Sequence, residues 1–207
     1  MALHDYAADI LGSKTSIRLL RALSRYRGKV FTVRELSLAA GVSHPQASAV
    51  LKGLERRGVV KLQPVGKAYQ VSLNEESYVI KSMIEPLFTA ERDTVDSLIA
   101  TIRPFFDYAR ILSAAVFGSV ASGEEGNASD IDLLVIADDR DFAIRKAAGA
   151  AFAVLSQFGH VLSPLILSRE RFAKDRDEEL EKSILEHYVL VCGKDLREVA
   201  ESGKTGR

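Results

Sequence analysis

The sequence predicts an α/β (α+β) protein in which two modules are joined by a long connector helix. Three observations support this expectation. The front of the chain contains helix-type segments followed by two short β-type runs, whereas the back alternates apolar strands with helices. The charge balance also changes sign: residues 1–75 carry 12 Lys and Arg against 5 Asp and Glu, and residues 76–207 carry 16 against 23. Modules of opposite charge are expected to have different partners.

The composition excludes several classes of protein. The 207 residues are 47% hydrophobic and 27% charged, which is typical of a globular protein. No apolar run approaches the roughly 20 residues that span a bilayer, and the first residues are acidic where a signal peptide would be basic. Cys192 is the only cysteine, so the chain has neither a disulfide framework nor a cysteine-based zinc site. We therefore expect a cytoplasmic protein with no membrane partner.

The front module is expected to contain three short helices. The first segment, SKTSIRLLRALSRYRG, repeats apolar residues at helical spacing and stops at glycine. The next two, TVRELSLAAG and SHPQASAVLKGLERRG, each begin with the pattern of a capping box, Thr32 with Glu35 and Ser43 with Gln46. Only three residues, GVS, connect the second helix to the third, which predicts a tight helix-turn-helix.

A β-hairpin is expected directly after the third helix. Residues 59–63 and 68–73 are β-type runs around a Pro64-Val65-Gly66 turn. Three helices followed by a hairpin resemble the winged helix-turn-helix fold of the MarR/ArsR-like regulators, over residues 13–74. The resemblance implies that double-stranded DNA is a partner, which agrees with the basic charge of this half.

The resemblance also assigns roles to polar residues of the third helix and the hairpin. The helix would lie in the major groove and approach bases or phosphates through His44, Gln46, Ser48 and Lys52. Phosphate contacts, which position the protein without reading sequence, would come from Arg56, Arg57, Lys61 and Lys67. The alternatives are that these side chains only meet solvent, or that the front half binds a protein or RNA.

Between the modules, apolar residues recur in alternating steps of four and three, the heptad pattern of a helix that packs along one seam. The seam positions are Ile84, Phe88, Glu91, Val95, Leu98, Ile102 and Phe105. Pro86 suits the first turn of a helix, so one helix is expected from near Ile84 to Pro104. The seam could pack on the chain's own second module or on another copy. A homodimer is expected, because two DNA half-sites need two readers.

The back half reads as strands that alternate with helices. The expected strands are ILSAAVF, DIDLLVI, HVLSPLIL and a final YVLVCG, and the long segment DFAIRKAAGAAFAVLSQF is expected to be a helix. This helix has a broad apolar face, made of Ile144, Ala147, Ala148, Ala151, Leu155 and Phe158. The expected modules are 1–75, the connector 76–107, and 108–207.

One stretch of the back half, AVFGSVASGEEGNASDIDLLVI, carries a pattern suited to phosphate and metal chemistry. Gly118 follows a strand and lets the backbone turn sharply and approach a ligand, and Ser119 offers a hydroxyl at the start of the next segment. Asp130 and Asp132 are two apart in a strand, so both carboxylates face the same side. Two such carboxylates repel unless cations lie between them, and their hard oxygens favour Mg²⁺.

Gly118, Ser119, Asp130 and Asp132 match, without a gap, the signature of the DNA polymerase β-like nucleotidyltransferase superfamily. Over residues 108–195 the chain resembles its minimal branch, the relatives of kanamycin nucleotidyltransferase. The resemblance implies transfer of a nucleoside monophosphate from an NTP, with ATP expected. Gly118 and Ser119 would hold the triphosphate, and Asp130 and Asp132 would be the catalytic and metal-binding residues.

The sequence departs from this superfamily at one position. Active members generally carry a third carboxylate on the next core strand, which binds metal and activates the acceptor. The expected position falls at Leu165, with Ser163 its neighbour on the same face, and neither is a base or a strong Mg²⁺ ligand. Loss of a general base lowers a rate by about 10²–10⁴-fold. Glu124 or Glu125 in the preceding loop could substitute.

These observations leave three interpretations of the back half. The chain could transfer a nucleotide onto a small molecule or a protein, including a toxin-type partner, while the winged helix controls a gene. It could instead be a transcription regulator whose second module only senses nucleotide. The simplest alternative is a loop without a ligand, in which Asp130 caps a turn.

Overall fold

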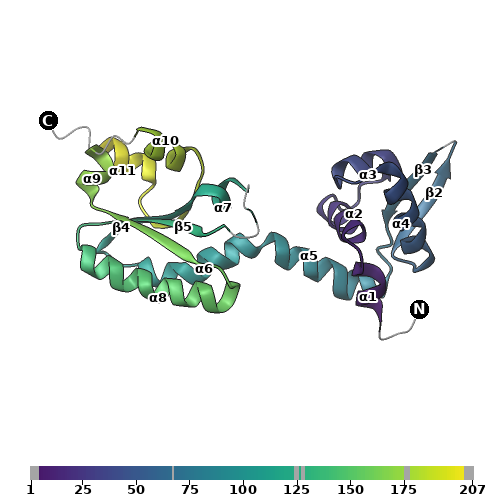
Figure 1. Cartoon of the computed structure of the whole chain (residues 1–207), viewed down its shortest axis with the longest axis horizontal. Helices are drawn as coiled ribbons and strands as arrows, with labels where there is room; N and C mark the ends of the chain where they lie inside the picture. Colours follow the sequence, from purple (N-terminus) through teal and green to yellow (C-terminus); the bar gives the residue numbers. More distant parts are fainter. Residues whose placement is uncertain (1–4, 67, 124–125, 127–128, 175–177, 203–207) are drawn as a thin grey trace. The chain divides into compact units, whose positions relative to one another are not determined.

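The computed structural model describes residues 5–66, 68–123, 126, 129–174 and 178–202. The chain divides into two compact units, with the boundary between Asp93 and Thr94 in the sequence. Figure 1 shows the elements of each unit. We call residues 1–93 the first unit and residues 94–207 the second unit. No helix in the described part of the chain is long and apolar enough to cross a bilayer.

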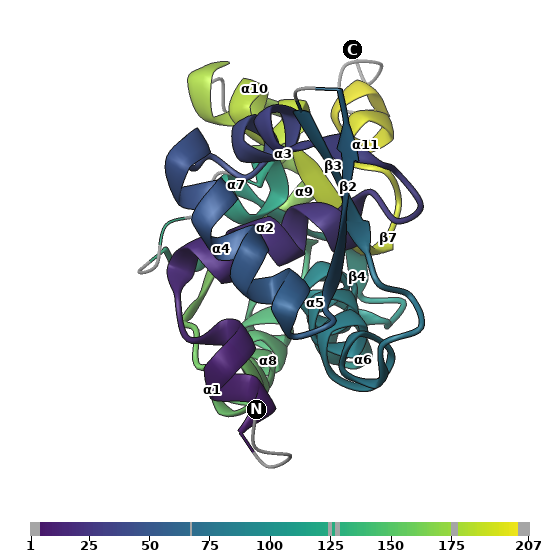
Figure 2. The same cartoon turned by 90° about the vertical axis from the view of Figure 1, so that its right-hand side faces the viewer.

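The first unit is a winged helix-turn-helix in which a small antiparallel sheet, of order β1-β3-β2, packs beside helices. Figures 1 and 2 show α2, α3 and α4 next to the β2–β3 hairpin. Its core is made by fully buried side chains such as Leu20, Leu51 and Val71. The elements are α1 (Tyr6–Leu11), α2 (Lys14–Arg25), β1 (Phe31–Thr32), α3 (Val33–Ala39), α4 (His44–Arg56), β2 (Val60–Val65), β3 (Ala68–Leu73), the π-helix η1 (Ile80–Ile84) and α5 (Glu85–Arg92).

One of the two expected capping boxes is present. The Thr32 hydroxyl accepts from the Glu35 backbone N–H at 3.2 Å, and the Glu35 carboxylate accepts from the Thr32 N–H at 2.7 Å. The expectation for Ser43 is wrong, because its hydroxyl donates to the Gln46 side chain at 3.0 Å and caps no backbone N–H. Because the Ser43 and Gln46 side chains bond to each other, the Ser43 side chain accepts no hydrogen bond from the first backbone N–H groups of α4.

The hairpin turn begins two residues later than the sequence pattern indicated. Pro64 still pairs with Tyr69 and Val65 with Ala68, so the strands part only at Gly66, whose φ is +60°. A proline is tolerated within β2 because β2 is an edge strand of the sheet. The expectation that Pro64 and Val65 form the turn is therefore wrong.

The connector is divided, although one helix was expected there. Helix α5 ends at Arg92, and a new helix, α6, begins at Thr94. Pro104 lies inside α6 instead of ending it, since α6 continues to Phe106. A proline has no backbone N–H, so Pro104 removes one hydrogen bond from α6, and the helix ends only two residues later.

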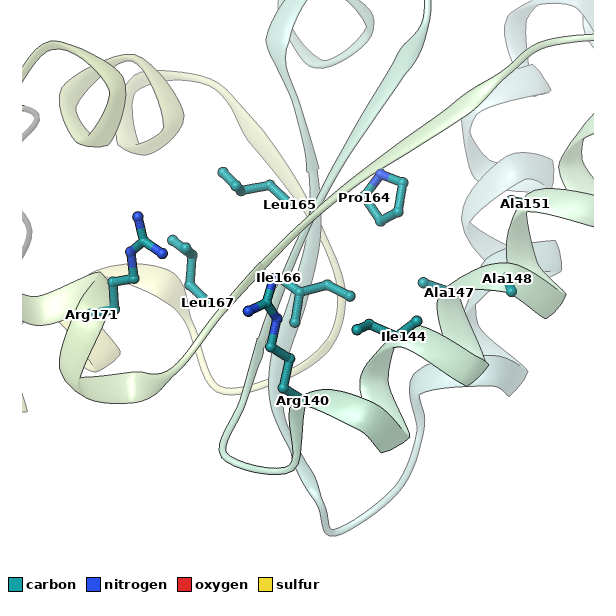
Figure 3. A pocket seen from close by; sticks show the side chains of 10 residues that line it. All are labelled: Arg140, Ile144, Ala147, Ala148, Ala151, Pro164, Leu165, Ile166, Leu167 and Arg171. Carbon is teal, nitrogen blue, oxygen red and sulfur yellow. The ribbon is translucent and has the colours of Figure 1, made fainter.

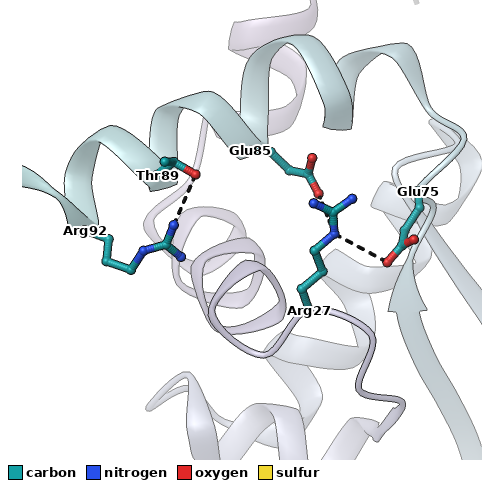
Figure 4. A network of polar contacts seen from close by, with 5 residues as sticks. All are labelled: Arg27, Glu75, Glu85, Thr89 and Arg92. Atoms are coloured by element: carbon teal, nitrogen blue, oxygen red, sulfur yellow. Dashed lines mark hydrogen bonds and ion pairs between the residues drawn. The ribbon is translucent and has the colours of Figure 1, made fainter.

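Polar contacts attach α5 to the rest of the first unit. Arg27, just after α2, lies between Glu75 and Glu85, at 3.7 and 3.3 Å from their carboxylates (Figure 4). Glu91, which the heptad pattern placed on the seam, pairs with Arg21 at 2.7 Å. Arg21 and Glu91 are both about half exposed, so this pair adds little stability by itself. The buried Phe88 is the main apolar contact of α5.

The second unit is a four-stranded mixed sheet of order β6-β5-β4-β7 covered on both faces by helices. Strands β5 and β6 are parallel, and the other pairs are antiparallel. Helices α6 and α8 cover one face, and α9, α10 and α11 cover the other. The elements are α6 (Thr94–Phe106), β4 (Ile111–Phe117), α7 (Gly118–Ser122), β5 (Ile131–Ala137), α8 (Arg140–Phe158), β6 (Leu162–Leu167), α9 (Arg169–Lys174), α10 (Glu178–Glu186), β7 (Tyr188–Gly193) and α11 (Leu196–Ser202).

Helix α8 packs through small residues, and part of its expected apolar face is exposed. Its buried residues are Ala143, Ala147, Ala150 and Val154. A side chain at Gly149 would come within 2.8 Å of the Phe105 ring, so glycine lets α6 and α8 approach closely. Ile144 and Leu155, two residues of the apolar face noted in the sequence, are 45% and 54% exposed.

A groove of about 470 Å³ separates α8 from the edge strand β6. Its walls are mostly apolar, with Ile144 from α8 and Pro164 and Ile166 from β6 (Figure 3). Arg140, at the start of α8, and Arg171, on α9, also line this groove, near the Leu167 end of β6 (Figure 3).

Candidate functional site

The end of β4 lies beside the start of β5, which brings the glycine of the motif against an aspartate. Phe117 is in register with Asp132. Gly118 has φ +71°, and a Cβ built on it would lie only 2.5 Å from Oδ2 of Asp132. A side chain at this position would therefore meet both backbone strain and a collision, and only glycine fits.

The two aspartates face the same side of the sheet. Leu134 and Ile136 pack against α9–α11, and side chains alternate along β5, so Asp132 and Asp130 are on that face as well. Asp132 is half-buried, whereas Asp130 is exposed at the start of the strand. Burial, and then the negative charge of Asp130, raises the pKa of the Asp132 carboxyl. The pair thus carries negative charge that a bound cation would neutralise.

Strand β6 places Ser163 next to the pair. Ser163 is in register with Asp132, and its hydroxyl donates to Oδ2 of Asp130 at 3.2 Å. Leu165, where the third carboxylate was sought, is in register with Leu134 and packs into the apolar cluster. The residue beside the acids is therefore Ser163, which the sequence had named only as a neighbour. The parallel register of β5 and β6 shows that Ser163 is beside the acids, whereas the spacing of residues along the sequence does not show it.

The donor set suits one hard divalent cation. Asp130 and Asp132 would supply carboxylate oxygens, the hard ligands that Mg²⁺ prefers. Among the residues that the structure describes, no group of three or more His, Cys, Asp or Glu side chains could hold a metal ion. Glu124 and Glu125, the proposed substitutes, lie outside the described residues.

Ser119 is the second residue of the short helix α7, directly after Gly118. It is half-buried, and its carbonyl accepts from the Ser122 hydroxyl at 3.2 Å. The helix ends at Gly123 in the left-handed conformation. Gly118, Ser119 and Asp132 thus come from one strand-turn-helix junction and its neighbouring strand, as the sequence pattern indicated.

Two other ionisable side chains of the second unit are not available as bases. The Tyr188 hydroxyl donates to both carboxylate oxygens of Asp195, at 2.8 and 2.7 Å, and burial followed by this bond raises the Tyr188 pKa. Burial, and then the charge of Asp107, raises the pKa of Cys192 to about 11. The Cys192 thiol lies 3.2 Å from the Phe106 carbonyl oxygen. Cys192 is therefore an unreactive thiol at neutral pH.

A polar stripe runs along the outer face of α4. His44, Ser48, Lys52 and Arg56 recur at steps of four, and all except the half-buried Ser48 are exposed. The opposite face carries the buried Ala47, Leu51 and Leu54. Gln46 is exposed near the start of α4, and Lys61 is exposed on β2. Lys67, also assigned to phosphate contacts, lies outside the described residues.

Arg57 does not share this stripe. Its Nη1 donates to the Gly53 carbonyl at 3.0 Å, and its Nη2 lies 3.9 Å from the Asp9 carboxylate of α1. Arg57 is half-buried and, with Asp9 and Gly53, lines a cavity of about 390 Å³ between α1 and α4. Its contacts join α4 to α1.

Comparison with known proteins identifies a family for each unit. The MarR family model matches residues 13–68, and the model described as polymerase beta, nucleotidyltransferase matches residues 100–195. These matches confirm both resemblances drawn from the sequence motifs. No curated protein matches the sequence significantly.

Solved structures show only weak similarity. A crystal structure of a toxin-antitoxin with AMP-PNP is 18% identical, over 53% of this chain and 83% of that chain, with a TM-score of 0.38. TrmBL2, an archaeal chromatin protein, is 18% identical over 92% of this chain and 70% of that chain, with a TM-score of 0.28. Structural similarity with TM-scores this low supports no conclusion about function.

Proposed function

We propose that this chain, which joins a MarR-family winged helix to a polymerase β-type nucleotidyltransferase domain, is a DNA-binding regulator that binds a nucleoside triphosphate with Mg²⁺. The second unit takes the triphosphate, with ATP the expected one. The first unit takes double-stranded DNA. Each assignment is supported by residues that the fold brings together and by the family of its unit.

The observation that carries the nucleotide site is the contact of Gly118 with the Asp132 carboxylate. The Gly118 turn, whose backbone has no side chain to keep phosphate oxygens away, is next to the Asp132 carboxylate, and a cation would offset the repulsion between Asp132 and Asp130; both features support the proposal. When bound there, Mg²⁺ would neutralise charge on the phosphates. Asp130 and Asp132 would hold the cation, and Gly118 and Ser119 would orient the triphosphate through the backbone and the hydroxyl.

Transfer of the nucleotide is the second candidate function, and the paired aspartates favour it. In the transfer, an acceptor oxygen on a small molecule or a protein, such as a toxin-type partner, attacks the α-phosphorus, and pyrophosphate leaves. The described residues beside the pair supply no base to take the acceptor's proton, because Ser163 stands where a carboxylate would act. Binding therefore has more support from the geometry than transfer has.

The DNA site is proposed on the polar stripe of α4. His44, Lys52 and Arg56 lie on one exposed side of a helix whose other side is fixed in the core, which is the arrangement needed for a helix to enter the major groove. Lys61 on β2 would add a phosphate contact. A homodimer is proposed because a single winged helix reads only one half-site.

Calorimetric titration of ATP with Mg²⁺ tests the nucleotide site. Wild type should bind, and Asp132→Asn should bind at least tenfold more weakly, because one cation ligand loses its charge. Asp138→Asn is the matched control, since Asp138 is exposed beyond the other end of β5. Absence of binding by wild type, or equal binding by Asp132→Asn, overturns the assignment. ATP labelled at the α-phosphate separates the two candidates: label that moves to an acceptor shows transfer.

A further inference from the structure

The hydrogen bond between Ser163 and Asp130 bears on how many cations the site can hold. Ser163 is in register with Asp132 and donates to Oδ2 of Asp130 at 3.2 Å. It is thus the side chain of β6 that reaches the acid pair. A serine hydroxyl is uncharged, so Ser163 adds no negative charge to the site.

Two divalent cations at one site lie about 3.5–4 Å apart, and their repulsion must be offset by anionic ligands. Sites of this kind need carboxylates that bridge the ions or bind each of them. Here Asp130 and Asp132 are the carboxylates that the described structure brings together, and the Ser163 proton occupies a lone pair on Oδ2 of Asp130. Two carboxylates, one of which also accepts the Ser163 hydrogen bond, are enough to bind the single cation that accompanies a triphosphate.

We propose that the second unit is a one-cation nucleotide site, and that Ser163 is the residue that sets this number. The inference rests on the proposed nucleotide binding and adds its metal stoichiometry. Ser163 acts through its lack of charge, and its hydroxyl makes one hydrogen bond to the Asp130 carboxylate. Because it is uncharged, no second cation is held beside the acceptor, where such an ion would lower the pKa of the attacking hydroxyl.

The register of β5 and β6 identifies a substitution that would let the site hold a second cation. An aspartate at position 163 would project from β6 at the level of Asp132, next to both acids. Three carboxylates would repel one another in the free protein and would favour a second divalent ion once the triphosphate is present. Leu165 offers no such route, because its neighbours are the apolar residues packed against α9–α11.

The test is a Mn²⁺ titration of the full chain in the presence of a saturating non-hydrolysable ATP analogue, with free Mn²⁺ followed by electron paramagnetic resonance. Wild type should take up about one Mn²⁺ per chain, and Ser163→Asp about two. Ser163→Asn is the matched control, since it has nearly the size of aspartate without the charge, and it should stay at about one. Ser163→Ala should also stay at about one, because the missing charge, and not the hydrogen bond, excludes the second ion.

The outcomes separate this inference from the proposal on which it rests. Uptake of two ions by wild type or by Ser163→Ala overturns the one-cation inference and leaves nucleotide binding intact. Absence of both Mn²⁺ and nucleotide uptake by wild type overturns the proposed function itself. A folded Ser163→Asp that binds the analogue with only one ion shows that Ser163 does not set the number. If Ser163→Asp does not fold, the wild-type titration still decides whether the site holds one cation.

Discussion

A Gly118→Ala substitution should destabilise the second unit and weaken its nucleotide binding. The backbone at Gly118 has φ +71°, a conformation that costs a residue with a Cβ about 1–2 kcal/mol. The new Cβ would also lie 2.5 Å from Oδ2 of Asp132, so the carboxylate must leave its rotamer at a cost of about 0.5–1.5 kcal/mol. The free energy of unfolding should therefore fall by roughly 1.5–3.5 kcal/mol.

A control and a double-mutant cycle isolate the contact with Asp132. Gly123 has φ +74°, and no atom of the described residues lies within 4 Å of a built Cβ, so Gly123→Ala should show the backbone cost alone, about 1–2 kcal/mol. In an Asp132→Ala background, the loss of unfolding free energy caused by Gly118→Ala should fall to this backbone cost, because the colliding carboxylate is absent. Urea unfolding of the second unit, followed by circular dichroism, measures all four variants. An unchanged cost of Gly118→Ala without Asp132 would refute the proposed contact.

Three further predictions concern charge, DNA and capping. The raised pKa of Asp132 means that its ionised form destabilises the native state, and stability falls as pH rises through that pKa. Asp132→Asn should therefore unfold at higher urea than wild type at pH 7, and the gain should vanish below the ordinary carboxyl pKa; equal midpoints at pH 7 contradict this. Arg56→Ala should weaken binding to duplex DNA and reduce its log–log salt slope by about one, measured by fluorescence anisotropy. Arg57→Ala, whose side chain contacts Gly53 and Asp9, should mainly lower the melting temperature, and a larger salt effect than that of Arg56→Ala would place Arg57 on the DNA face. Thr32→Ala should cost about 1 kcal/mol in urea unfolding, and Ser43→Ala clearly less, because Ser43 caps no backbone N–H; equal losses would show that capping is not the cause.

Local chemistry accounts for the parts of the fold that could be predicted from the sequence. The Thr32–Glu35 capping box depends on residues three apart, and helices α2, α3 and α4 and strands β2 and β3 of the first unit follow from short-range periodicity. The same holds for the strand-turn-strand pattern around Gly118. The second capping box was wrong because Ser43 and Gln46 have a side-chain alternative that is equally local.

Helix α8 and the connector show where periodicity is insufficient. Several apolar stripes run along α8, and the packing partner decides that Ala143, Ala147 and Ala150 are buried while Ile144 is exposed. Gly149 receives the Phe105 ring, which draws the small-residue face toward α6. The connector breaks at Asp93 although its heptad pattern continues across this position, and Glu91 of that pattern pairs with Arg21 of α2, a residue far away in the chain.

The sequence by itself determined the chemistry of the candidate site: a glycine that permits a left-handed turn, a serine after it, and two aspartates two residues apart on one strand face. Only the tertiary structure decided which residue stands beside those acids. The parallel register of β5 and β6 puts Ser163 there and sends Leu165 into the apolar layer. The physical reason is that side-chain alternation is a property of one strand, whereas register between strands depends on long-range packing of the whole sheet.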